Sequence, residues 1–128
     1  MNAECRLLLV DAPGIQWGLD APQVRQAMDP RSYQGPPPID VAAILGVAAR
    51  GDDHRVLIVS TPEGPLALRA VGEIRIAAVA RSEILELPAE LPRTAISETV
   101  RAVIFREGAA PILLLRPERV AAAAGELP

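Results

Sequence analysis

Few side chains in this sequence have the type and spacing that chemistry requires. His54 is the only histidine, and it closes the stretch "GDDH", residues 51–54, in which two carboxylates stand beside the imidazole. Adjacent side chains on a loop rarely converge on one ion, so this stretch is interpreted as a solvated turn and not as a metal site. Glu83 and Glu86 have helical spacing, but their segment is too short to bury a carboxyl group, and both are interpreted as surface charge. The sequence therefore predicts no catalytic residue, no metal and no cofactor.

The other reactive or aromatic residues fit a packing role better. Cys5 is the only cysteine, which excludes an internal disulfide, and beside an apolar run it is expected to pack as a small hydrophobic side chain. Trp17 lies on an expected strand and Met28 ends an apolar pattern, so both are interpreted as core residues. No G-x-G-x-x-G follows a strand, and no G-x-S-x-G is present. These observations argue against an enzyme.

The charge pattern excludes further classes of function. All 13 basic residues are arginine, so a P-loop lysine and a Schiff-base lysine are absent. The formal net charge is −3 and the arginines are dispersed, whereas phosphate contacts need clustered positive charge, so we predict no nucleic-acid partner. No apolar run approaches the length of a membrane span, and the N-terminal apolar run is too short for a signal peptide. We therefore expect a cytoplasmic protein without membrane insertion.

The apolar pattern predicts a mostly β protein with an aliphatic core, since Trp17, Tyr33 and Phe105 are the only aromatic residues. Repeated hairpins without long intervening helices favour antiparallel sheets or small barrels over a doubly wound parallel sheet. The predicted hairpins span residues 5–20, 55–71 and 99–115, and short helices are predicted over 21–28, around 41–46 and from Pro117 to Gly125. Between the first two hairpins stands a rigid interruption, Pro36–Pro38, which cannot donate backbone hydrogen bonds.

Taken in order, these elements resemble the CheW family, the adaptors that couple chemoreceptors to a histidine kinase in bacterial chemosensory arrays. The resemblance runs from about Leu7 to Ala121 and is carried by the order of several weak motifs. These motifs are "QWGLDAPQVRQAM", "PPIDVAAILG", "HRVLIVSTPEGPLALRAVGEI", "RSEILELP" and "VRAVIFREGAAPILLLRPERVA". The resemblance implies a single CheW-like domain over residues 1–128, built from a pair of small antiparallel β-barrels with short helices.

Two departures from the family pattern bear on this expectation. Gln26 stands where family members usually carry Glu, and Gly72 stands where they usually carry Asp. In addition, "MDPRSYQGPPP" runs past the place of an extra strand, so about 15 residues are missing by comparison with the family. The first barrel, over about residues 1–55, is therefore expected to be incomplete. The second barrel is placed at about 56–116, and the C-terminal helix and tail at 117–128.

The resemblance implies a non-catalytic adaptor that binds a methyl-accepting chemoreceptor and modulates its coupling to a CheA-type histidine kinase. The missing strand suggests that kinase binding is weakened or lost, as in the accessory CheW-like adaptors of Frz-type pathways that control gliding motility. The partner-binding residues expected near the barrel junction are Val24, Arg25, Met28, Val71, Ile74 and Ile76. Core packing is an equally good interpretation of the apolar members of this set, and an ordinary solvated charge of Arg25.

Three further hypotheses follow. An incomplete barrel exposes unpaired strand edges, which predicts a homodimer by strand exchange or edge pairing unless Pro36–Pro38 blunt the gap. A detached regulatory barrel that acts directly on a histidine kinase would share the same fold. A small ligand-binding barrel or enzyme unrelated to signalling is the third alternative, and it predicts a pocket with converging polar groups.

Overall fold

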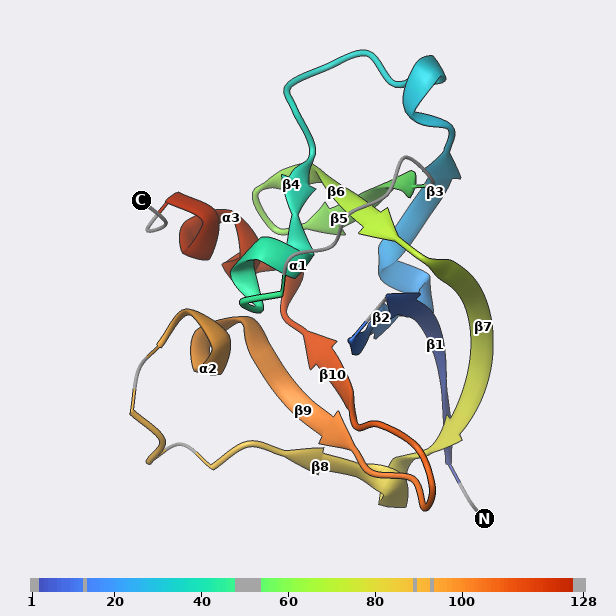
Figure 1. Cartoon of the computed structure of the whole chain (residues 1–128), viewed down its shortest axis with the longest axis vertical. Coiled ribbons are helices and arrows are strands. Elements are labelled where there is room, and N and C mark those ends of the chain that lie inside the picture. Colours follow the sequence, from blue (N-terminus) through green and yellow to red (C-terminus); the bar gives the residue numbers. More distant parts are fainter. Residues whose placement is uncertain (1–2, 13, 48–53, 89, 93, 126–128) are drawn as a thin grey trace.

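The computed structural model describes residues 3–12, 14–47, 54–88, 90–92 and 94–125. Two sheets and several short helices make up this part of the chain (Figure 1). Most of the "GDDH" stretch lies outside the described residues. The described residues are mostly in strands, as the sequence predicts.

The larger sheet has six strands in the order β7-β1-β2-β10-β9-β8, all antiparallel except for β10 beside β2. Its strands are β1 Glu4–Ala12, β2 Ile15–Asp20, β7 Glu73–Ala80, β8 Ile84–Glu86, β9 Val100–Ile104 and β10 Ile112–Leu115. The smaller sheet has the order β3-β5-β6-β4, with β4 parallel to β6. Its strands are β3 Val24–Met28, β4 Ile39–Asp40, β5 His54–Thr61 and β6 Gly64–Val71. The strands of the larger sheet come from both ends of the chain, so the two sheets do not follow one another in sequence.

Short helices fill the corners between strands. The α-helices are α1 Val41–Ile44, α2 Ala95–Thr99 and α3 Pro117–Gly125, and the 3₁₀ turns are η1 Ala21–Gln23, η2 Pro30–Ser32 and η3 Arg81–Glu83. The sequence predicted α3 with both of its ends, because proline suits the first helical turn and glycine ends a helix. It did not assign α2, which begins with a capping box between Thr94 and Ser97. Among the described residues, no helix is long and apolar enough to cross a membrane.

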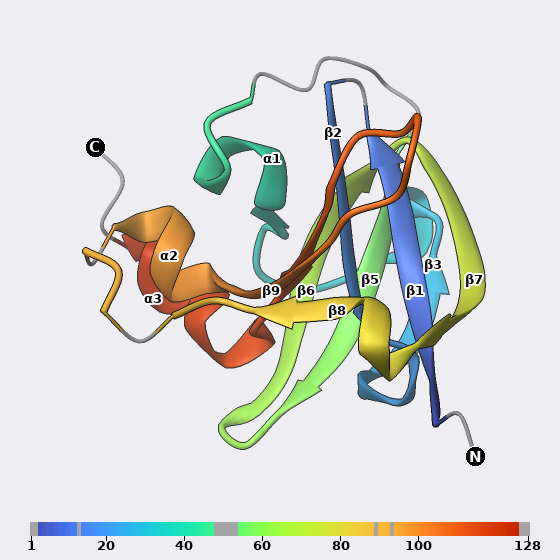
Figure 2. The same cartoon turned by 90° about the horizontal axis from the view of Figure 1, so that it is seen from below.

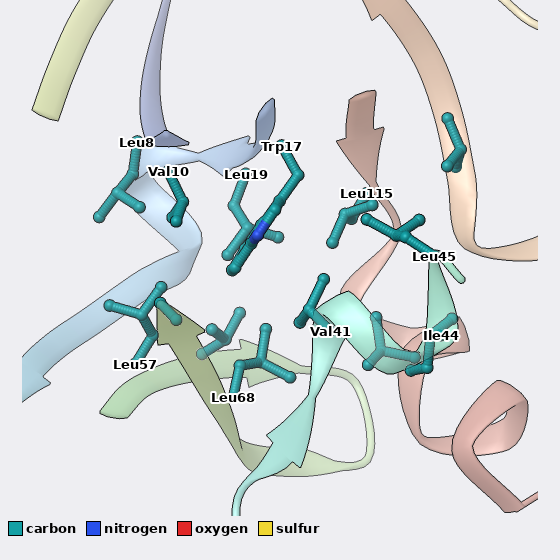
Figure 3. Close-up of a cluster of buried hydrophobic side chains, with 14 of the residues drawn as sticks. Leu8, Val10, Trp17, Leu19, Val41, Ile44, Leu45, Leu57, Leu68 and Leu115 are labelled. Atoms are coloured by element: carbon teal, nitrogen blue, oxygen red, sulfur yellow. The ribbon is translucent and has the colours of Figure 1, made fainter. Parts of the chain in front are cut away.

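The main core lies between the two sheets and under the helices. Trp17 is only 1% exposed and packs there with leucine and valine side chains from both sheets, from α1 and from the end of β10 (Figure 3). A second cluster fills the interior of the larger sheet, and it includes Leu7, Leu9, Ile104 and Leu114. The aliphatic core and the packing role of Trp17 are therefore as predicted. Since the main cluster draws on both sheets, the two halves of the fold stabilise each other.

The helix predicted over residues 21–28 is wrong. Residues 21–23 form a single 3₁₀ turn, and the chain then extends into β3, which pairs with β5 from Val24 opposite Val59 to Met28 opposite Val56. The helical spacing of Val24, Ala27 and Met28 predicted a helix wrongly. The helix propensities of ordinary residues differ from one another by only tenths of a kcal/mol, so they favour a helix only weakly. Pairing with a neighbouring strand outweighs such differences.

The smaller sheet is open between its two edge strands. Its two edges are β3 and β4, and the chain between them, Asp29–Pro38, contains one 3₁₀ turn and no strand. This connection bows outward from the sheet (Figure 1), with the Tyr33 hydroxyl donating to the Pro36 carbonyl oxygen at 2.6 Å. The prolines thus hold the chain away from the gap. The pair of β-sheets with short helices confirms the predicted mostly β fold class.

Gly72 marks the crossing from the smaller sheet to the larger one. It lies between β6 and β7 with a φ of 120°, a conformation that favours glycine. A Cβ atom on this residue would collide with the carbonyl oxygen of Asp11 and lie 3.0 Å from the Cα of Ala12. The position where the family usually carries Asp is therefore one where this chain needs glycine.

Candidate partner-binding surface

The strands β3 and β7 belong to different sheets but border one hollow on the surface. This hollow has a volume of about 330 Å³ and is lined by Ala27 of β3, His54 and Arg55 of β5, Gly72, and Ile74 of β7. β5 brings the two strands together, because it pairs with β3 on one side and with β6, which leads into β7, on the other. The fold thus places two segments beside one another that are more than 40 residues apart in the sequence.

The six residues predicted to bind a partner all lie on the elements around this hollow, but they differ in accessibility. Val71 is 6% exposed and belongs to the core, while Val24 and Ile74 are half-buried and pack against the main cluster. Met28 is also half-buried, Arg25 is exposed, and Ile76 is 51% exposed. Packing therefore accounts for Val71 and for part of Val24 and Ile74. The accessible members are Arg25, Met28 and Ile76.

Ile76 is one of five large apolar side chains that are exposed among the described residues. It pairs with Leu8 of β1, and Ile74 pairs with Val10, so the two isoleucines lie on the face that turns toward the main core. Ile74 still contacts the core, whereas Ile76 lies two residues further along β7, where the core ends. Single exposed apolar side chains are common on protein surfaces, so Ile76 points to a partner only together with the hollow that Ile74 lines two residues away.

His54 and Arg55 belong to this site, although the sequence did not indicate them. The register of the β5–β6 hairpin places His54 opposite Val71. The apolar alternation of residues 54–61 and 64–71, on either side of the turn, would have predicted this pairing from the sequence. The Nδ1 atom of His54 is buried and has no hydrogen-bond partner among the described residues. A buried polar atom without a partner costs roughly 1–3 kcal/mol, so this nitrogen is a feature that a bound partner could satisfy.

We call Arg25, Ala27, Met28, Arg55, Ile74 and Ile76 the β3–β7 surface. Ala27, Arg55 and Ile74 line the hollow, while Arg25 and Met28 lie elsewhere on β3 and Ile76 lies two residues beyond Ile74 on β7. Neither Arg25 nor Arg55 forms an ion pair within the described part of the chain. Arginine and large apolar side chains are common at the energetic centres of protein interfaces. This composition suits a partner with apolar side chains and negative charge.

A larger hollow, of about 660 Å³, lies at one end of the larger sheet. It is lined by Glu4, Cys5, Arg6, Asp20, Pro22, Gln23, Arg81, Ile84, Glu86 and Arg101. Two of these lining residues form an ion pair, in which Arg101 Nη2 lies 2.8 Å from Asp20 Oδ1. Within the described residues, no group of three or more His, Cys, Asp or Glu side chains could hold a metal ion. Glu83 pairs with Arg106 at 3.6 Å on the surface, and Glu86 is exposed.

Comparison with known proteins identifies the fold. No protein-family model matches the sequence, and no curated protein matches it. Among solved structures, the crystal structure of the scaffolding protein TtCheW from Thermoanaerobacter tengcongensis matches with a TM-score of 0.71. The match covers 89% of this chain and 90% of that one, at 15% sequence identity. The fold is CheW-like. Within this CheW-like fold, the connection 29–38 between β3 and β4 contains no strand, and the β3–β7 surface lies where the two sheets meet.

Proposed function

We propose that this protein is a non-catalytic adaptor of a bacterial chemosensory system that binds a methyl-accepting chemoreceptor through the β3–β7 surface. The observation that carries the proposal is the exposed Ile76, two residues along β7 from Ile74, which lines the hollow with Ala27 and Arg55, on a CheW-like fold. The apolar side chains and the two arginines of this surface suit a receptor helix with apolar and acidic side chains. The adaptor in turn modulates the coupling of this receptor to a CheA-type histidine kinase.

We further propose that direct kinase binding is weak. In the family that the sequence resembles, both barrels make contacts. Here the smaller sheet ends at β3 and β4, and the connection 29–38 bows away from the gap (Figure 1). A partner that binds a strand at this position has no such strand to contact here, neither by its side chains nor by its backbone groups. The shortened barrel extends the proposal to the accessory adaptors of Frz-type gliding-motility pathways.

Binding to the two partners, each measured separately, tests this function. The protein is titrated with a cytoplasmic fragment of a chemoreceptor and, in a second experiment, with the regulatory domain of a CheA-type kinase. We expect saturable binding to the receptor fragment and weak or absent binding to the kinase domain. Strong kinase binding without receptor binding would refute the proposal in favour of a detached regulatory barrel.

A pair of matched variants locates the contact. Ile76→Asp places a charge on the β3–β7 surface, and we expect it to weaken receptor binding by about 10-fold or more, as for an interface hot spot. Leu85→Asp is the control, because Leu85 is 53% exposed, close to the 51% of Ile76, and lies on β8 at the opposite edge of the same sheet. Equal losses in the two variants would show that the receptor does not bind at the β3–β7 surface.

A further inference from the structure

The two open sheets expose four strand edges, and three of them are blunted. β4 has only two residues and directly follows Pro36–Pro38, while β8 has only three residues. β3 carries a register irregularity between Val24 and Gln26, and prolines stand at both of its ends, at positions 22 and 30. Short length, bulges and proline are the means by which proteins prevent strand edges from pairing with other chains. The gap in the smaller sheet, where the sequence located self-association, is therefore a poor place for it.

The edge strand β7 has none of these features. Its eight residues contain no proline or glycine, and its register with β1 continues without a shift from Glu73 opposite Asp11 to Ala80 opposite Glu4. Eight residues extend over about 26 Å at the usual rise of a strand. The side of β7 that faces away from β1 borders no other strand in either view (Figures 1 and 2). A long, regular and weakly charged edge is a template for strand pairing.

The sequence of this edge is complementary to itself. The stretch from residue 73 to residue 81, "EIRIAAVAR", begins with an acidic residue and ends with a basic one. When two such strands pair antiparallel about a twofold axis at Ala77, Glu73 of each copy lies opposite Arg81 of the other. Arg81 is the first residue of η3, and its amide still donates to the Ala3 carbonyl oxygen at 3.0 Å, which extends the β1 register by one pair. In the same β7–β7 register Ile76 lies opposite Ala78, so a large exposed side chain meets a small one. Opposite charges at directly opposed positions stabilise antiparallel pairs.

We propose that β7 is a homodimerisation edge, at which two copies of this chain join their six-stranded sheets by antiparallel β7–β7 pairing centred on Ala77. The pairing is isologous, so each dimer contains two equivalent Glu73–Arg81 pairs. It leaves the β1–β7 pairing and both cores unchanged, because it uses only the outer backbone groups of β7. The partner is a second copy of this chain, and because Ile76 lies opposite Ala78 in this pairing, the dimer and the proposed receptor contact use the same edge of β7 and would exclude one another.

Sedimentation equilibrium over a range of concentrations tests this proposal with a charge-reversal cycle. Glu73→Arg and Arg81→Glu each place like charges opposite one another at both ends of the pairing. We expect each to weaken the dimer by about 10-fold. The double variant Glu73→Arg/Arg81→Glu restores opposite charges, and we expect its dissociation constant to return to within about threefold of the starting value. Glu63→Arg, in the exposed turn between β5 and β6, is the control and leaves the dimer unchanged.

Three results would overturn the proposal. One is a protein that stays monomeric up to about 1 mM, a concentration at which even weak specific pairs associate. Another is a dimer that both single reversals leave intact, and the third is a double variant that is no tighter than the singles. Hydrogen exchange gives an independent measurement, because dimerisation protects amides of β7 in a concentration-dependent way. Circular dichroism and the melting temperature confirm that each variant is folded.

Discussion

Replacing Gly72 by alanine measures how closely the two sheets are joined. Two effects oppose the substitution: a backbone φ of 120°, and a Cβ that would collide with the Asp11 carbonyl oxygen. The chain contains a matched control in Gly64, whose φ is 118° and whose Cβ would meet nothing within 4 Å. Gly64→Ala therefore reports the cost of the backbone conformation alone, and the difference between the two variants reports the collision.

The magnitudes follow from the local geometry. The unfavourable φ costs about 1–3 kcal/mol, and it is common to both variants. To relieve the collision, β1 and the start of β7 must move apart near the pair formed by Asp11 and Glu73. Losing about two backbone hydrogen bonds there, at about 1 kcal/mol each, together with disturbed packing, adds roughly 2–4 kcal/mol for Gly72→Ala. Because the total stability of a domain is only about 5–15 kcal/mol, this is a large fraction.

The assay is urea unfolding followed by circular dichroism, with thermal melting as a second measurement. We expect Gly72→Ala to melt about 8–15 °C below Gly64→Ala, at about 4 °C per kcal/mol for a domain of this size. Failure of Gly72→Ala to fold, while Gly64→Ala folds, would agree with the same reasoning. Two variants that differ by less than about 0.5 kcal/mol would refute it, because the close approach to Asp11 would then cost nothing.

Two further predictions concern the core and the start of α1. Trp17→Ala removes a side chain that is 1% exposed between the sheets, and we expect a loss of about 3–5 kcal/mol in urea unfolding. A loss below about 1 kcal/mol would contradict its central place in the core. Asp40→Ala removes the cap in which Asp40 accepts from the Ala42 amide at 3.2 Å, and the ion pair with Arg69 at 3.4 Å. We expect a loss of about 1 kcal/mol in thermal melting. Asp40→Asn keeps an acceptor and should lose less than half as much, and equal losses would exclude capping as the cause.

Much of the local structure could be predicted from residues that are close in sequence. The hairpin β5–β6 follows from alternating apolar residues on both sides of a turn that contains Gly64, and α3 follows from Pro117 and Gly125. The connection without a strand between β3 and β4 was foreseeable because three consecutive prolines stand in it. In each case the deciding interaction spans only a few residues, so the sequence pattern contains it.

The β3–β7 surface shows where such reasoning stops. Its predicted members came from a family resemblance, and the structure divides them into core residues such as Val71 and accessible ones such as Ile76. His54 was interpreted as part of a solvated turn, yet it lines the hollow opposite Val71. Exposure depends on what packs above a residue, and for these strands that neighbour comes from a distant part of the chain.

The amino-acid sequence by itself determined the aliphatic core, the hairpins, the strand-free connection at Pro36–Pro38 and the end residues of α3. Only the tertiary structure decided that residues 24–28 form a strand, that each sheet combines distant segments, and that β7 is the one long unblunted edge within the described residues. The physical reason is the range of the interactions involved. Turns and caps are settled by neighbouring residues, whereas an extended segment has no internal backbone hydrogen bonds and takes its conformation from the strand beside it.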